Sequence, residues 1–151
     1  MRPPRRILGL ALVVALLVAL VACDAAELVP QPGGPRPQAL QGTNWSVVTV
    51  AGRAPQQGAA MTIMFLASTA RGSGGCNQFG GNYQYDASTG RIAFKELGMT
   101  AMACVQAQRM DLEAAYVQAL GRATQVDVDA DGHLVIGGPG GVVIFAAMLE
   151  G

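Results

Sequence analysis

Short strand-like segments run through most of this 151-residue chain and constrain its fold more than any other feature. Each is rich in β-branched, aromatic or aliphatic residues, as is typical of β-strands. They cover residues 40–50, 61–66, 81–85, 91–97, 125–129, 133–136 and 142–148. Between two of them, Ala130-Asp131-Gly132 predicts a hairpin turn, because an Asp-Gly pair tolerates positive φ. The segments therefore predict a largely antiparallel sheet.

A single segment, Gln106 to Leu120, has the apolar spacing of a helix. Gly121 follows as a C-terminal stop signal. One helix packed against an antiparallel sheet is an α+β fold. Its predicted buried face carries Leu112, Tyr116, Ala119 and Leu120.

The N-terminus has the order of parts found in a bacterial lipoprotein signal. Three arginines precede an apolar run from Ile7 to Val21, and the small Ala22 stands directly before Cys23. We therefore expect residues 1–22 to be a signal peptide and Cys23 to carry the lipid. An uncleaved membrane anchor is the alternative, but the apolar run is shorter than the roughly 20 residues needed to span a bilayer.

Cleavage before Cys23 places the mature protein on the outer side of the cytoplasmic membrane, which is the periplasm of a Gram-negative cell. Asp24 resembles the inner-membrane retention signal of enteric bacteria, and the outer membrane remains an alternative. Removing three of the ten basic residues leaves seven against ten acidic residues, a net charge of −3. A mildly acidic domain without a basic patch excludes nucleic acid as the expected partner.

Proline and glycine fill the segment that follows Cys23 and disfavour a helix there. We therefore expect residues 23–38 to be the lipidated cysteine and a tether, and residues 39–151 to form one folded domain. The breakers are Pro30, Pro32, Gly33, Gly34, Pro35 and Pro37.

Two cysteines remain once Cys23 is lipidated, an even number in an oxidising compartment. We expect a disulfide between Cys76 and Cys104, closing a loop of 29 residues. The alternative is a pair of free buried thiols, because sequence does not show whether the two Cβ atoms meet. A metal site has less support, since no other Cys or His stands near either cysteine in the sequence.

The residues around these cysteines carry a family resemblance. The order G-C-N, G-x-Y and T-x-M-x-C, followed by a helix and a closing hairpin, resembles the META domain, the family of the bacterial heat-inducible protein HslJ. The resemblance implies an antiparallel, partly barrel-like sheet packed against one helix, a link with heat or envelope stress or drug tolerance, and no established catalytic residue. The motif residues are Gly42, Thr43, Trp45, Gly75, Cys76, Asn77, Gly80, Tyr83, Gly98, Met99, Thr100, Met102 and Cys104.

We expect mostly structural roles for these motif residues. Trp45 is expected to close one end of the core with its N–H satisfied. Asn77 is expected to adopt a left-handed turn or to bond the local backbone, with ligand binding as the alternative. Met99 and Met102 are expected to fill gaps in the core, with a functional pocket as the alternative.

The sequence contains no catalytic, metal or cofactor signature that we expect to be functional. The acidic residues at 127, 129 and 131 imitate a calcium loop, but Gly138 stands where the bidentate Glu belongs. His133 has no identifiable nucleophile beside it, so a solvated turn residue is expected.

We therefore expect a lipid-anchored, non-catalytic accessory protein of the cell envelope, without a cofactor. It would bind an envelope protein through the sheet or through the loops around Asn77 and Tyr83. A small protease inhibitor or chaperone-like binder is the alternative, and an enzyme has the least support.

Overall fold

The computed structural model describes residues 35–102, 104 and 106–148. The signal peptide, Cys23 and most of the tether lie outside the described residues. Among those described, no helix is both long and apolar enough to cross a bilayer. In chain order the elements are β1 (Asn44–Val50), β2 (Met61–Phe65), β3 (Thr69–Gly74), β4 (Gln78–Asp86), β5 (Arg91–Met99), α2 (Ala107–Gly121), β6 (Gln125–Val128), β7 (Leu134–Gly138) and β8 (Gly141–Ala147).

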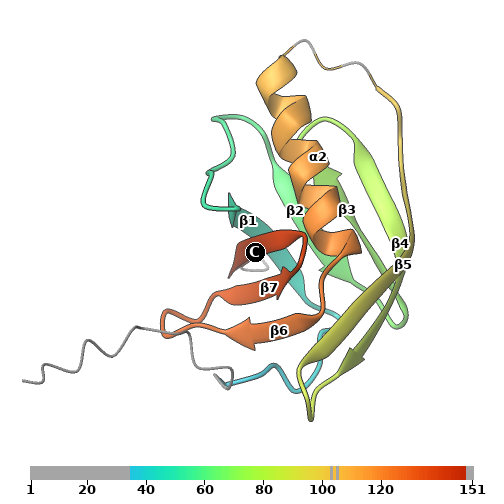
Figure 1. Cartoon of the computed structure of the whole chain (residues 1–151), viewed down its shortest axis with the longest axis vertical. Coiled ribbons are helices and arrows are strands. Elements are labelled where there is room, and N and C mark those ends of the chain that lie inside the picture. Colours follow the sequence, from blue (N-terminus) through green and yellow to red (C-terminus); the bar gives the residue numbers. More distant parts are fainter. Residues whose placement is uncertain (1–34, 103, 105, 149–151) are drawn as a thin grey trace, which may run out of the picture. The chain divides into compact units, whose positions relative to one another are not determined.

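The eight strands form a closed antiparallel barrel in which neighbours in sequence are neighbours in space (Figure 1). The barrel closes where β8 pairs with β1. Its weakest seam lies between β5 and β6, where Arg91 opposite Gln125 is the one registered pair along these two described strands. The predicted antiparallel, barrel-like sheet packed against one helix is confirmed.

Apolar and polar residues alternate along the strands, so that the apolar side chains point into the barrel. In β2, Met61, Ile63 and Phe65 are buried while the residues between them are partly exposed. The hairpin predicted around Gly132 joins β6 to β7, and Gly132 has the expected positive φ of 82°. A strand that the sequence pattern did not indicate, β3, lies between β2 and β4.

Helix α2 packs on the barrel through the face predicted from its apolar spacing. Tyr116 is fully buried, and its ring meets Phe79 and Phe145 at centroid distances of 5.4 and 6.0 Å. The Tyr116 hydroxyl donates to the Thr62 carbonyl oxygen at 3.2 Å, which satisfies the polar end of a buried ring. The helix runs from Ala107 to Gly121, so it begins and ends one residue later than the predicted segment Gln106 to Leu120.

The described end of the tether lies against the barrel. The Val128 N–H donates to the Pro35 carbonyl at 2.9 Å, and the Tyr85 hydroxyl donates to the Pro37 carbonyl at 2.7 Å. Arg36 adds an ion pair with Asp127 at 3.6 Å. These contacts attach residues 35–37 to β4 and β6.

Candidate functional site

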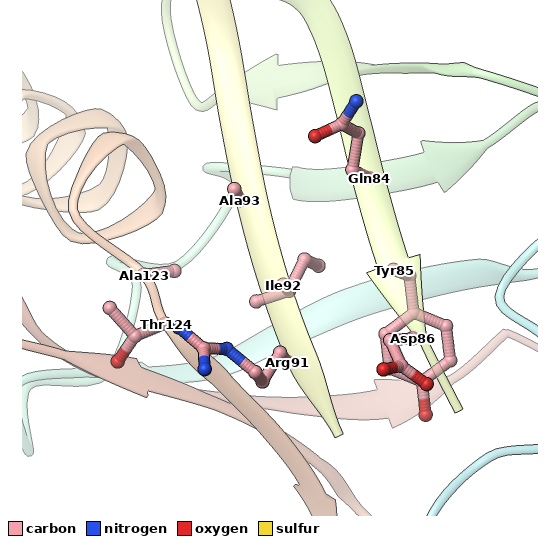
Figure 2. Close-up of a pocket in the computed structure, with 8 residues that line it drawn as sticks. All are labelled: Gln84, Tyr85, Asp86, Arg91, Ile92, Ala93, Ala123 and Thr124. Atoms are coloured by element: carbon pink, nitrogen blue, oxygen red, sulfur yellow. The ribbon is translucent and has the colours of Figure 1, made fainter. Parts of the chain in front are cut away.

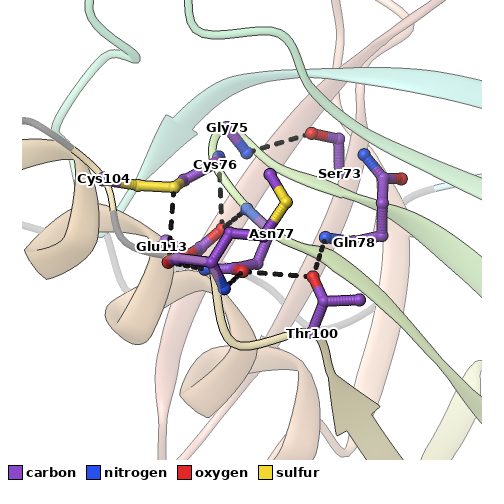
Figure 3. The surroundings of a disulfide bond; sticks show 9 residues. Ser73, Gly75, Cys76, Asn77, Gln78, Thr100, Cys104 and Glu113 are labelled. Carbon is purple, nitrogen blue, oxygen red and sulfur yellow. Dashed lines mark hydrogen bonds between the residues drawn. A yellow bond between two sulfur atoms is a disulfide. The ribbon is translucent and has the colours of Figure 1, made fainter.

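A disulfide links Cys76, in the turn between β3 and β4, to Cys104, in the segment that leads into α2 (Figure 3). The two Cα atoms are 6.0 Å apart, within the usual range for a disulfide. The predicted pairing is confirmed. The bond ties the segment after β5 to the turn between β3 and β4, where the motif residues gather.

Asn77 is buried, with 4 % of its surface exposed, and it connects the β3–β4 turn to two distant segments. Its side-chain oxygen accepts from the Met102 N–H at 2.6 Å and from the Thr100 hydroxyl at 3.1 Å. Its side-chain amide donates to the Glu113 carboxylate at 2.7 Å. The expectation that Asn77 adopts a left-handed turn or that its side chain bonds the local backbone was wrong, since Asn77 has no positive φ and its side-chain partners lie more than 20 residues away.

Glu113, on the buried face of α2, completes this network, and the sequence analysis missed it. Only 2 % of its surface is exposed. Besides the Asn77 side chain, its carboxylate accepts from the backbone N–H groups of Asn77 at 2.6 Å and Cys76 at 3.3 Å (Figure 3). A buried carboxylate requires such donors, because water no longer solvates it. The signal for this role was the helical spacing of Glu113 with Tyr116 and Leu120.

The glycines of the turn make room for this carboxylate. A Cβ atom added at Gly74 would lie 2.6 Å from Glu113 Cγ, closer than real atoms approach. Gly75 has a φ of 101°, which strains other residues. A Cβ at Gly80 would meet nothing closer than 3.7 Å. Gly74 therefore permits the close approach of Glu113, and Gly75 permits the turn.

Beside this network lies a groove of about 510 Å³ with an apolar lining. Three of its methionines are among the most exposed large apolar residues described: Met99 at 46 %, Met102 at 61 % and Met110 at 45 %. The expectation that Met99 and Met102 fill gaps in the core was wrong. The lining also includes Asn77, Thr100, Ala101, Glu113 and Ala114.

Backbone geometry in β5 explains the exposure of Met99. Glu96 adopts a positive φ of 56°, and the pairing of β4 with β5 shifts between Gly80 and Asn82. The alternation that buries Ile92 and Phe94 is thereby lost, and Gly98 and Met99 are both exposed. Such a bulge re-aims the side chains that follow it.

The remaining motif side chains are structural. Tyr83 is buried, and its hydroxyl donates to the Leu66 carbonyl at 2.8 Å; burial raises its pKa above the usual value of 10.0. Trp45 is partly buried against the core, and its N–H donates to Thr43 Oγ1 at 2.8 Å. The loops around Asn77 and Tyr83 were expected to contact a partner; both side chains are buried, so within these loops the exposed neighbours offer the larger contact surface. Gly42 has a positive φ of 80° in the turn before β1.

A second hollow, of about 430 Å³, lies at the hairpin end of β4 and β5 (Figure 2). Its charged side chains are Asp86 and Arg91. The Asp86 carboxylate accepts from the Ser88 and Thr89 hydroxyls and the Ser88 N–H, and these bonds, the Ser88 hydroxyl foremost, lower its pKa to about 2. This carboxylate stabilises the turn between the strands. No nucleophile paired with a base lines this described hollow.

The turn between β6 and β7 brings Asp129, Asp131 and His133 together, with side-chain ligand atoms within 4.8 Å of one another. Asp129 accepts the N–H groups of Asp131 and His133 at 3.0 and 2.9 Å, and its second oxygen lies 3.1 Å from His133 Nδ1. The bond from the His133 N–H is the main cause of the lowered pKa of Asp129. The hairpin interpretation of this acidic stretch is confirmed.

Comparison with known proteins identifies the family. The META domain model matches residues 38–148, nearly all of the described fold. The chain belongs to the META domain family. Among curated proteins, none matches the chain.

Two solved structures have a similar fold. An NMR structure of a protein from Burkholderia xenovorans is 26 % identical, with a TM-score of 0.57; the match covers 78 % of this chain and 92 % of that one. A second protein solved by NMR is also 26 % identical, with a TM-score of 0.59, over 70 % of this chain and 89 % of its own.

Proposed function

We propose that this META domain is a lipid-anchored, non-catalytic binding protein of the cell envelope, and that it docks a protein partner in the methionine-lined groove. The observation that carries the proposal is the exposure of Met99, Met102 and Met110 along one groove. Methionine adapts its shape to varied apolar partners, and exposed apolar clusters mark interaction sites. The disulfide and the Asn77–Glu113 network hold the walls of this groove.

Site-specific photocrosslinking in intact cells tests the docking surface. A photoreactive residue at Met102 should give a discrete crosslinked protein, and the same residue at Val142, 44 % exposed on β8, should not. Met99→Ser and Met110→Ser should weaken the Met102 crosslink while the thermal melt is unchanged. Equal crosslinking from Val142, or a Met102 crosslink that both serine variants leave intact, would contradict the groove as the docking site.

Anchoring at Cys23 has its own test. Cys23→Ser should remove metabolic lipid labelling and leave the precursor uncleaved, because both lipid transfer and cleavage need the thiol. Unchanged processing and no lipid label on the wild-type protein would instead indicate an anchor made by the apolar segment.

The non-catalytic part of the proposal is tested by a hydrolase screen. His133 is the chain's one histidine, and its Nδ1 faces Asp129. Hydrolysis that disappears in a folded His133→Ala variant would replace the binding role by an enzymatic one.

A further inference from the structure

In the methionine-lined groove, the polar side chains already make hydrogen bonds, whereas the methionine sulfur atoms make none. Thr100 Oγ1 donates to Asn77 and accepts from the Gln78 N–H at 3.0 Å. The Asn77 amide and the Glu113 carboxylate bond each other and neighbouring backbone groups. Across the described residues, no hydrogen bond involves the sulfur of Met99, Met102 or Met110, although Met64 sulfur accepts one from Arg71. The thioethers are therefore the groups left to bind a ligand.

Among the described side chains that line the groove, none offers a free carboxylate to a hard cation. Glu113 is the one charged residue of the described lining, and its carboxylate is 2 % exposed and bonded to three N–H groups. Calcium, magnesium and manganese prefer carboxylate, carbonyl and water oxygens, and zinc prefers thiolate and imidazole. Thioether sulfur is a soft ligand that selects Cu(I).

Charge in the groove also favours a cation. In the described part of the chain, the Glu113 carboxylate has no ion pair with a Lys, Arg or His side chain. This carboxylate therefore lines the same groove as the methionines without a neutralising cationic side chain. In a partly desolvated groove such a charge acts on a nearby ion more strongly than it would in bulk water.

We propose that Met99, Met102 and Met110 form a binding site for one Cu(I) ion. Met99 and Met102 come from the segment at the end of β5, and Met110 comes from the first turn of α2. The Cys76–Cys104 disulfide ties the segment that connects these two walls to the β3–β4 turn, which fixes this segment without the metal. The site goes beyond the proposed protein docking, because it requires no protein partner.

Competition with a chromophoric Cu(I) chelator, bicinchoninate, tests the proposal on the full-length chain purified in detergent and kept anaerobic. The wild type should withdraw one equivalent of Cu(I), and the Met99→Leu/Met102→Leu/Met110→Leu variant should withdraw none. Loss of an outer-shell partner typically weakens a metal site about 10- to 100-fold, so loss of one thioether ligand should weaken binding at least about tenfold. A thiol assay before and after titration confirms that the disulfide is intact.

Met148→Leu is the matched control, because Met148 is 47 % exposed yet does not line the groove. It should bind Cu(I) as the wild type does. Ag(I), which is soft and inert to oxidation, should shift the NMR signals of three methionine methyl groups and leave the others in place. Undiminished binding by the triple variant, equal loss in Met148→Leu, or no Ag(I)-dependent shift of these three signals would overturn the proposal.

Discussion

The buried network is tested most directly by exchanging the hydrogen-bond donor of Asn77 with the acceptor of Glu113. Glu113→Ala would leave the Asn77 N–H and side-chain amide without their close acceptors, and both bonds are buried. An unsatisfied buried donor costs about 1–3 kcal/mol, so the two together should cost about 2–6 kcal/mol. That is a large share of the roughly 5–15 kcal/mol that stabilises a typical domain.

Glu113→Gln keeps the size of the side chain but places an NH2 group where the carboxylate oxygen was. Two donors, this group and the Asn77 amide, would then face each other at 2.7 Å. Asn77 cannot rotate its amide freely, because its oxygen already accepts from the Met102 N–H and the Thr100 hydroxyl. Asn77→Asp alone would bring two carboxylates together. Each single variant should therefore be destabilised, the Asp variant more than the Gln variant.

The double variant Asn77→Asp/Glu113→Gln restores the match, since the Gln amide donates to the new carboxylate. Residues in one network commonly show coupling energies of about 0.5–3 kcal/mol, and we expect a favourable coupling of at least about 1 kcal/mol. Urea unfolding of the four-protein cycle, followed by circular dichroism, measures it. A double variant no more stable than the sum of the single losses would refute the assigned donor and acceptor pattern.

Three further outcomes follow from the structure. Cys104→Ala should lower the free energy of unfolding by about 3–4 kcal/mol, because the unfolded chain regains the entropy of a 29-residue loop, and the melting temperature should fall by more than about 10 °C. An unchanged melting temperature would show that the disulfide does not stabilise the fold. Gly74→Ala should cost about 1–3 kcal/mol by clashing with Glu113, while Gly80→Ala, with space for a Cβ, should be nearly neutral; equal losses in urea unfolding would contradict the close-approach role. Burial raises the pKa of Tyr116 well above 10.0, so stability present below pH 10 should be lost as the pH rises beyond it, less steeply in Tyr116→Phe. Tyrosinate absorbance of the native protein at pH 10.5 close to that of the unfolded chain would refute this burial effect.

Local patterns in the sequence were enough to predict much of the fold. The spacing of Leu112, Tyr116 and Leu120 identified α2 and its buried face, and the Asp-Gly pair identified the hairpin between β6 and β7. Strand β3 was not predicted because its sequence, TARGSG, contains one buried aliphatic side chain and three small residues. A strand whose neighbours require small residues has no apolar alternation to reveal it.

The candidate site was harder to predict, because its bonds join residues far apart in the chain. Asn77 and Glu113 are 36 positions apart, and no local pattern indicates that they meet. Exposure of Met99 depends on the positive φ of Glu96 and on the register shift opposite it. Neither residue type requires that geometry, so the methionines were assigned to the core on hydrophobicity alone.

The attachment of residues 35–37 to β4 and β6 governs which way the domain faces once Cys23 carries lipid. Only eleven residues separate Cys23 from Pro35, so that proline lies no more than about 40 Å from the anchored cysteine. Tyr85, which holds the tether, pairs with Ile92 near the start of β5, whereas Met99 ends the same strand, roughly 25 Å away at about 3.3 Å per residue. If Cys23 carries lipid as proposed, the chain joins the barrel to the bilayer at the end where Tyr85 bonds Pro37. The groove lies at the other end of β5, so a partner or an ion would reach it away from the point of attachment.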